Sequence, residues 1–536
     1  MKFNINNKFS IINLSSFIFF LINFFLFFFS YIIDSSIIKQ YLLLIIIIIP
    51  LIGFFLVMFS FIILKIDSKL IIYNFSLCIS WINVILSFLL WYFYTNFIRG
   101  FQFVIKFIQI PMYDYNIFIG IDGFSLYFII LTNLIIFLCI YSLTPIFLQL
   151  RSMLALLLVL QWGILCSFSI LDLVGFFVFF ETTLIPIFII IIFWGSRERK
   201  VRASYLISLY TLAGSIFMLF NIIFLISKVG STNYYALCSF VYSFEEQKIL
   251  WLTFFIAFAV KIPLIPAHIW LPEAHVEAPT VGSVILAALL LKLGGYGFIR
   301  YNLTLFPLAT VYYTPLINTI CLLSILYTGI IAIKQTDLKK IIAYSSIGHM
   351  AVIIIGLVAS TVESISSAVF QMISHGFVSA GLFFCVGILY DRYHTRYINY
   401  FGGASDNLPI FSNIFFIFCL SNMSFPYTSN FIGEFLLLSS SFSNNHTVVI
   451  IATLGSFLIA TITILSFNRI CFGTNKLKSN FKIPDINFRE LFILLTIIFC
   501  IIALGIYPSI ILNGVVMPSF ILELQYKNAI LYFNLI

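Results

Sequence analysis

Long apolar segments follow one another along this 536-residue chain, and they constrain its fold more than any other feature. A helix needs about 20 apolar residues to cross the ~30 Å hydrocarbon core of a bilayer, and many of the segments are that long. Hydrophobic residues make up 62% of the chain and charged residues only 9%. No soluble core holds so much apolar surface, so we expect the chain to lie in a membrane. The segments are continuous rather than alternating, which favours helices over barrel strands.

We predict fifteen membrane-spanning helices in a single membrane domain, since no linker separates soluble parts. The first is too long for the apolar part of a signal peptide and no small-residue cleavage site follows it, so it is kept as a span. The predicted spans cover residues 9–33, 41–64, 70–96, 118–143, 150–170, 171–195, 202–227, 248–270, 280–301, 312–333, 338–360, 363–390, 407–442, 448–473 and 488–512.

Basic residues are divided unequally between the two sides of the membrane that these spans predict. One side of the membrane carries the N-terminus and the loops that follow the even-numbered spans. It holds 19 of the 28 lysines and arginines, and the other side holds 7. The positive-inside rule makes the first a matrix-like or cytoplasmic side. We call it the positive side and the other the opposite side. The two remaining basic residues, Lys261 and Lys292, fall inside predicted spans.

Other features of the composition argue against a metal site and against nucleic-acid binding. The nine cysteines are scattered and none has C-x-x-C spacing, so each is expected to act as a small apolar residue. The net charge of +9 is explained by loop residues, and no basic run with interleaved aromatics occurs. Enrichment in Phe, Ile, Asn, Lys and Tyr, whose codons are AT-rich, is typical of an organellar or endosymbiont genome.

One charge is placed near the predicted midplane of the membrane. Lys261, in FAVKIPLIPAHIW, lies between Trp251 and Trp270, roughly 15 Å from each at 1.5 Å of helix rise per residue. A lysine side chain does not reach the surface from that depth. Because a charge at the bilayer centre costs about 2.5–3.5 kcal/mol on insertion scales, such a residue faces a wet cavity or pairs with another charge.

Five more titratable residues are predicted at similar depth: Glu181, Lys292, His349, His375 and Glu434. Burial disfavours the charged form of such groups, and an opposite charge nearby favours it. A pair whose members move apart therefore gates protons without covalent chemistry. Structural ion pairs and satisfied core histidines are the alternative interpretation, but six groups at one depth favour a proton relay.

Prolines interrupt two of the predicted spans close to a buried charge. Pro263 and Pro266 follow Lys261, and Pro426 precedes Glu434. Proline removes a backbone donor and breaks a helix, and the freed carbonyls then need water or protein partners. Two interrupted spans, five apart in order, are typical of the inverted repeats of transporters.

The segment KIPLIPAHIWLPEAHVEAPTVGSVILAALLLKLGGYGFIR, residues 261–300, resembles the chain 4 family of NADH:ubiquinone oxidoreductase (respiratory complex I). The bacterial counterpart is the M subunit. The resemblance extends over about 118–510 and includes IGIDGFSLYF, LYTLAGS, DLKKIIAYSSIGHM, SHGFVSAGLFFCVGILYDR and NFIGEF.

The resemblance implies an all-α polytopic membrane protein with the antiporter-like fold. That fold has two inverted five-helix repeats, two broken helices and fourteen core transmembrane helices. Either the additional predicted span is a lineage-specific N-terminal addition at 9–33, or the first three spans are misplaced. We expect N-terminal helices over 1–117, a proton-translocating core over 118–473, and a C-terminal helix and tail over 474–536. The loop 228–248 is unusual for the family and is expected to contact lineage-specific subunits.

The family's functional residues are carried over to matching positions. Lys261 corresponds to the central proton-carrying lysine, and Glu181 to the partner that modulates it. Three residues would relay protons along the central axis: Lys292, His349 and His375. Glu434 would be the terminal group of the second half-channel, and His268 would serve the entry path.

The resemblance also implies partners and a location. FMN, iron–sulfur clusters, NADH and ubiquinone would be bound by other subunits, with no cofactor on this chain. The expected partners are the antiporter-like chains 2 and 5, supernumerary subunits and lipids such as cardiolipin, in the mitochondrial inner membrane. Two alternatives are a subunit of a free-standing cation/proton antiporter and a scaffold without proton transfer. The first is disfavoured because such subunits carry lysine where this chain has Glu434.

Overall fold

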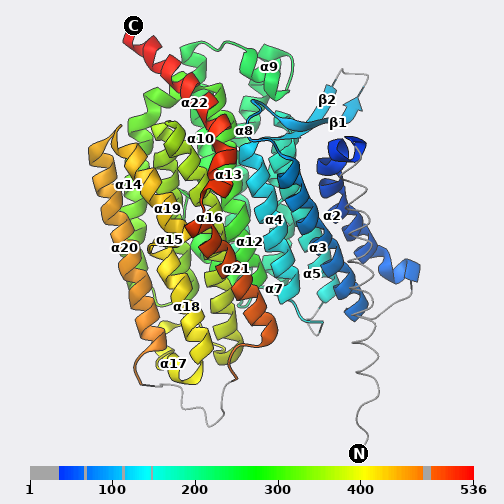
Figure 1. Ribbon diagram of the computed structural model, residues 1–536, viewed down its shortest axis with the longest axis vertical. Coiled ribbons are helices and arrows are strands. Elements are labelled where there is room, and N and C mark those ends of the chain that lie inside the picture. The colour runs from blue at the N-terminus through cyan, green and yellow to red at the C-terminus, as the bar shows by residue number, and fades with distance from the viewer. Residues whose placement is uncertain (1–35, 65–68, 111–114, 146–148, 475–483, 536) are drawn as a thin grey trace, which may run out of the picture.

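The computed structural model describes residues 36–64, 69–110, 115–145, 149–474 and 484–535. They form a bundle of long, nearly parallel helices with a small β-hairpin at one end (Figure 1). In this part of the chain, 13 helices are long and apolar enough to cross a membrane, judged by length and composition. The predicted all-α membrane fold is confirmed. The predicted span 9–33 lies outside the described residues, and the proposed domain boundaries stay predictions.

Most uninterrupted helices lie where the apolar segments predict them. Several begin at a side chain that caps the free backbone N–H groups of the first turn, as Asp122 does for α4 and Thr361 for α16. The helices are α2 Ser36–Leu64, α3 Lys69–Phe93, α4 Gly123–Ser142, α5 Leu150–Ser169, α8 Lys200–Val229, α14 Pro307–Lys334, α15 Leu338–Ala359, α16 Val362–Tyr393 and α20 His446–Cys471.

Two spans are broken at the predicted prolines. Helix α10, Phe244–Lys261, ends at Lys261, and α11, Trp270–Glu277, begins only after both prolines. Helix α18, Pro409–Asn422, is likewise separated from α19, Ser429–Phe442, by the turn that contains Pro426. A third span is divided into α6, Leu173–Thr182, and α7, Leu184–Trp194. Only Thr183 lies between these two helices.

The span that carries Lys292 is less regular than predicted. It consists of α12 Thr280–Ile285, the π-helical stretch η2 Leu286–Leu290, α13 Leu291–Gly297 and the π-helical stretch η3 Phe298–Leu303. This span and α16 are enclosed by the bundle, with every residue of their most apolar windows buried. Single π-helical turns inside helices are rare and occur frequently at functional sites.

A β-hairpin occupies residues for which no strand was predicted. Strands β1, Gln102–Ile110, and β2, Tyr115–Ile121, pair antiparallel and lie at the end of the bundle that carries the short helix α9, Tyr234–Ser239 (Figure 1). The predicted start of a span at residue 118 is therefore wrong. The helix begins at Gly123, because Asp122 caps it and the preceding residues belong to β2.

The C-terminal region contains a second helix where only a tail was predicted. Helix α21, Phe488–Ile506, is followed by α22, Ser509–Leu535. The start of α22 lies against the first turns of α4, where Tyr127 Oη donates to the Ile510 carbonyl at 2.7 Å. Near its other end, Tyr526 lies beside Thr314 of α14. Helix α22 therefore packs against α4 and α14 near the ends at which they begin, and its segment Ser509–Tyr532 is one of the 13 candidate spans.

Candidate functional site

The break after α10 places Lys261 against the end of α6. Its Nζ donates to the Phe180 carbonyl at 3.0 Å and lies 3.7 Å from the centre of the Phe180 ring. The last carbonyls of a helix lack intrahelical partners, so the ammonium group satisfies one of them. The side chain is only 3% exposed. Lys261 is therefore held by a carbonyl and an aromatic face rather than by a carboxylate.

Glu181 follows Phe180 directly but is not joined to Lys261. Lys261 and Ser215 lie close enough to act on its carboxylate electrostatically. Within the described residues, neither carboxylate oxygen makes a hydrogen bond of normal geometry. A buried carboxylate without such contacts is costly, so it needs water or a movement of Lys261 to be satisfied. Glu181 and Lys261 are thus close in space, but they do not form an ion pair within the described residues.

Lys292 lies at the centre of the bundle with 0% exposure. Its Nζ donates to the Ala287 carbonyl in η2 at 2.6 Å. It also lies 3.0 Å from His375 Nδ1 on α16. This lysine therefore has two partners, one from its own span and one from the neighbouring helix.

A close approach of helices places the spans of the two lysines side by side. A Cβ added to Gly294 would lie 3.2 Å from Lys261 Cβ and 2.8 Å from Ile262 Cγ1. Real Cβ atoms are not found at the second distance, so this position requires glycine if the spans are to stay in contact. The described residues show no direct hydrogen bond between the ammonium groups of Lys261 and Lys292.

From Lys292 a series of titratable side chains continues to Glu434. The rings of His375 and His349 have centroids 5.3 Å apart, and His349 Nδ1 lies 2.5 Å from Glu434 Oε1. These contacts join residues 83 and 85 positions apart in the chain. Four of the predicted residues thus come together in one connected line.

Two uncharged side chains that were not predicted also hold Glu434. Gln371 Nε2 donates to Oε1 at 3.3 Å, and Ser424 Oγ donates to Oε2 at 2.6 Å. Gln371 lies four residues before His375, one helical turn away on the same face, which is a signal that was available in the sequence. Ser424 lies in the turn between α18 and α19, and no sequence pattern marks it.

His268 is not joined to this line of residues. It lies in the break between α10 and α11, is 7% exposed, and packs edge-to-face against Tyr327 of α14 with ring centroids 5.6 Å apart. Within the described residues its Nδ1 has no hydrogen-bond partner. Its role in an entry path stays a prediction.

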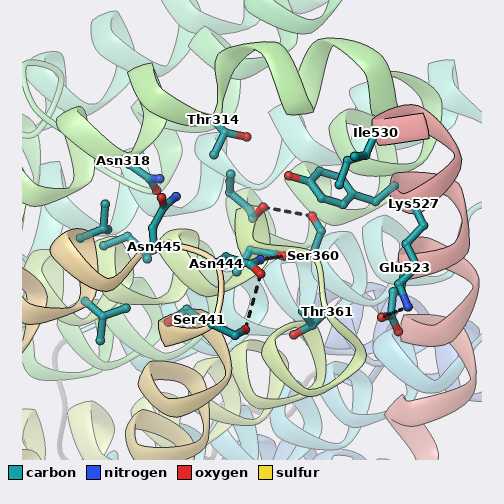
Figure 2. A pocket seen from close by; sticks show the side chains of 17 residues that line it. Thr314, Asn318, Ser360, Thr361, Ser441, Asn444, Asn445, Glu523, Lys527 and Ile530 are labelled. Carbon is teal, nitrogen blue, oxygen red and sulfur yellow. Dashed lines mark hydrogen bonds and ion pairs between the residues drawn. The ribbon is translucent and has the colours of Figure 1, made fainter. Parts of the chain in front are cut away.

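A polar cavity of about 420 Å³ lies beyond Glu434 on the opposite side (Figure 2). Serine, threonine and asparagine side chains at the ends of α15 and α19 and the starts of α16 and α20 line it. Ser441 is one of them and follows Glu434 by seven residues on α19, or about 10 Å along the helix. The ion-paired Glu523 and Lys527 of α22 lie at its edge, with Nζ and Oε1 2.8 Å apart.

The described residues contain no group of three or more His, Cys, Asp or Glu side chains that could hold a metal ion. The chemistry that this geometry offers is proton transfer among lysine, histidine and glutamate.

Comparison with known proteins identifies the family. Residues 171–460 match the family described as NADH:quinone oxidoreductase/Mrp antiporter, TM. The chain is 44% identical over 467 residues to NADH-ubiquinone oxidoreductase chain 4 of Chondrus crispus, which covers 87% of this chain and 94% of that relative. The chain belongs to the NADH-ubiquinone oxidoreductase chain 4 family. The chain 4 protein of Marchantia polymorpha is also 44% identical, over 87% of this chain and 93% of the relative.

Solved structures agree with the chain 4 family in fold. A chain of the respiratory complex I from Thermus thermophilus with bound NADH matches with a TM-score of 0.81 and 24% identity, covering 90% of this chain and 99% of that one. A chain of the Mrp complex from Dietzia sp. matches with a TM-score of 0.78 and 17% identity, covering 92% and 100%. At such identities the likeness concerns fold alone. Because the relatives at 44% identity are chain 4 proteins, the alternative of a free-standing antiporter subunit is not favoured over chain 4.

Proposed function

We propose that protons cross the membrane domain of this chain along the line Lys261, Lys292, His375, His349 and Glu434. The chain acts as a proton-translocating, antiporter-like subunit of NADH-ubiquinone oxidoreductase, and it is a multi-pass protein of the mitochondrial inner membrane. The observation that carries the proposal is the series of contacts from Lys292 to Glu434. Each member can bind and release a proton. Lys292 and His375 lie 3.0 Å apart, His349 and Glu434 lie 2.5 Å apart, and the rings of the two histidines have centroids 5.3 Å apart.

In this proposal, Lys261 and Glu181 form the gate of the line. Lys261 is bound by a backbone carbonyl next to Glu181, whose carboxylate makes no hydrogen bond of normal geometry within the described residues. A small shift at the broken helix exchanges one contact for the other and changes the proton affinity of the lysine. The energy for this shift comes from electron transfer in other subunits, since moving one proton against 100 mV costs about 2.3 kcal/mol.

The cavity beyond Glu434 is proposed as the connection to the opposite side. Its polar lining supports ordered water, because a cavity of this size with several hydrogen-bonding side chains holds water rather than staying dry. The face of α19 that carries Glu434 continues to Ser441 in the lining. The ion-paired side chains of Glu523 and Lys527 would lie at the point where water enters the cavity.

The redox chemistry is assigned to partner subunits. We propose that NADH, FMN, iron–sulfur clusters and ubiquinone are bound there. The proposed neighbours in the membrane are the antiporter-like chains 2 and 5, with supernumerary subunits and lipids such as cardiolipin at the remaining faces. The loop 228–248, which includes α9, is proposed to contact a lineage-specific subunit.

The proposed function is tested with the Lys261→Ala variant in membranes that contain the assembled enzyme. We expect NADH:ubiquinone turnover and proton pumping to collapse together while native gels show normal assembly. The matched control is Lys334→Ala, because Lys334 is exposed at the end of α14. If the assembled Lys261→Ala enzyme pumps at the control rate, Lys261 is a structural charge and the proposed relay is wrong.

A further inference from the structure

One buried histidine outside the proposed relay has no hydrogen-bond partner. His275 lies on α11, directly after the broken segment, and is 0% exposed. Its ring stacks on Phe383 of α16, with centroids 4.6 Å apart and planes 9° from parallel. Within the described residues, neither Nδ1 nor Nε2 makes a hydrogen bond. Native proteins rarely bury both polar atoms of a side chain in this way, so the site calls for a functional explanation or for water.

Two buried lysines lie close enough to act on this imidazole. Lys292 belongs to the relay, and Lys339 lies at the start of α15, on the positive side. Both ammonium groups act on His275 electrostatically. Lys339 is 3% exposed, and its Nζ donates to the Ala278 carbonyl, three residues after His275, at 2.7 Å. His275 therefore lies between the positive side and the centre of the relay.

The positive side of His275 is occupied by a cluster of charges that opens toward the surface. Arg197 and Asp337 form an ion pair at 3.8 Å, and the Arg197 side chain is 36% exposed. Deeper in the cluster, Glu277 and Arg396 are 1% and 3% exposed. Arg396 is bonded to the Val276 carbonyl, which fixes it beside His275 in the chain.

Buried polar atoms without hydrogen-bond partners are found in this cluster as well as at His275. In the described part of the chain, Glu277 Oε2 and Arg396 Nε also lack hydrogen-bond partners. Together with the two imidazole nitrogens they make four buried polar atoms within a short stretch of the fold. Buried polar atoms of this kind are satisfied by internal water, which makes about three hydrogen bonds per molecule. A file of water molecules from the charge cluster to His275 would satisfy all four.

We propose that His275 carries protons from the positive side to Lys292. The proposal rests on the proposed function and adds the group that loads its central lysine. The imidazole accepts, on one ring nitrogen, the excess proton that the water file carries from the positive side, and it releases the proton of the other nitrogen, through a further water, to the neutral amine of Lys292. One N–H bond forms as another breaks at the ring, and Lys292 gains the positive charge. Exchange of the two tautomers then resets the ring.

The alternative is that His275 is a flat side chain that packs on Phe383. Two variants separate the interpretations. His275→Phe keeps the ring and the stacking but cannot carry a proton. His275→Gln keeps a hydrogen-bonding group but cannot relay a proton between two atoms of a ring. A packing role predicts that His275→Phe retains activity, and a proton-carrying role predicts that both variants lose it.

The experiment uses the assembled enzyme in its own membrane. We expect both variants to assemble on native gels and to lose about tenfold or more in NADH:ubiquinone turnover and proton pumping. The remaining activity should show a larger solvent isotope effect, because proton delivery to Lys292 has become rate-limiting. His446→Gln is the matched control, since His446 is exposed and its ring also packs on a phenylalanine, Phe442, with centroids 4.3 Å apart.

The outcomes distinguish this inference from the proposed function. If either assembled variant turns over and pumps at the control rate while Lys261→Ala is inactive, the relay stands and the role of His275 is wrong. If Lys261→Ala is also fully active, the proposed function itself fails. Should His275→Phe prevent assembly, His275→Gln decides by the same criteria, and normal pumping in that variant overturns the inference.

Discussion

Replacing Glu181 by glutamine tests the gate at Lys261 without disturbing its packing. The side chains have nearly the same shape. Neither carboxylate oxygen makes a hydrogen bond of normal geometry in the described structure, so few favourable contacts are lost. The buried negative charge, which is costly, is removed. The same charge also attracts the Lys261 ammonium, so the two effects oppose each other and we expect the thermal stability and the assembly of the enzyme to change little.

The effect on function should be large because the charge acts on Lys261. Two unit charges roughly 6 Å apart interact by about 3 kcal/mol at an effective dielectric constant near 20. Losing that interaction changes the ratio of charged to neutral lysine by about a hundredfold. A gate that depends on this ratio no longer switches, so we expect turnover and pumping of Glu181→Gln to fall by about the same factor.

The assay compares Glu181→Gln with Glu181→Asp and with Glu198→Gln in membranes with equal amounts of assembled enzyme. Glu181→Asp keeps the charge and should be intermediate. Glu198 is exposed in a loop on the positive side, so its substitution should leave both activities unchanged. Normal coupled pumping by Glu181→Gln would refute the reasoning, because it would show that Lys261 works without a modulating carboxylate.

Two further predictions concern the contact between the lysine spans and the polar cavity. Gly294→Ala puts a Cβ 2.8 Å from Ile262 Cγ1 and should destabilise the protein by about 1–3 kcal/mol, seen as a lower melting temperature. Gly163→Ala, whose nearest contact would be 3.4 Å, should have little effect, and equal melting temperatures would contradict the close approach. Ser441→Phe fills part of the cavity and should slow pumping several-fold, whereas Ser439→Phe, on the exposed face of α19, should not. Equal pumping rates would show that protons do not leave through the cavity.

The burial of Lys261 and the end of its helix could be predicted from the sequence, but its contacts could not. The apolar segment around it predicts burial, and the prolines beside it predict the end of α10. Whether Lys261 meets the carboxylate of Glu181 or the carbonyl before it depends on how α6 ends, which periodicity does not reveal. Contacts such as that of Lys292 with His375 join distant positions, and no single-sequence pattern specifies them.

Each of the missed elements was missed for its own physical reason. Helix α22 contains Asn513, Pro518, Glu523 and Lys527, so it lacks the uniform apolar character by which spans were predicted. It packs instead against α4, α14 and α16, and Tyr127 of α4 donates a hydrogen bond to the Ile510 carbonyl at its start. The hairpin was missed because its second strand runs directly into the apolar sequence of α4. His275 lies within the quoted family segment, yet only its burial without partners distinguishes it.

The π-helical stretches on both sides of Lys292 have a mechanical consequence. Each holds an extra residue relative to an α-helical turn. When such a stretch relaxes to α-helix, everything beyond it turns by roughly 100°, the rotation of one residue at 3.6 residues per turn. If one stretch relaxed while the other took up the extra residue, the segment between them would rotate and swing the Lys292 ammonium away from His375. The two stretches together would thus let the centre of the span rotate while both of its ends stay in place.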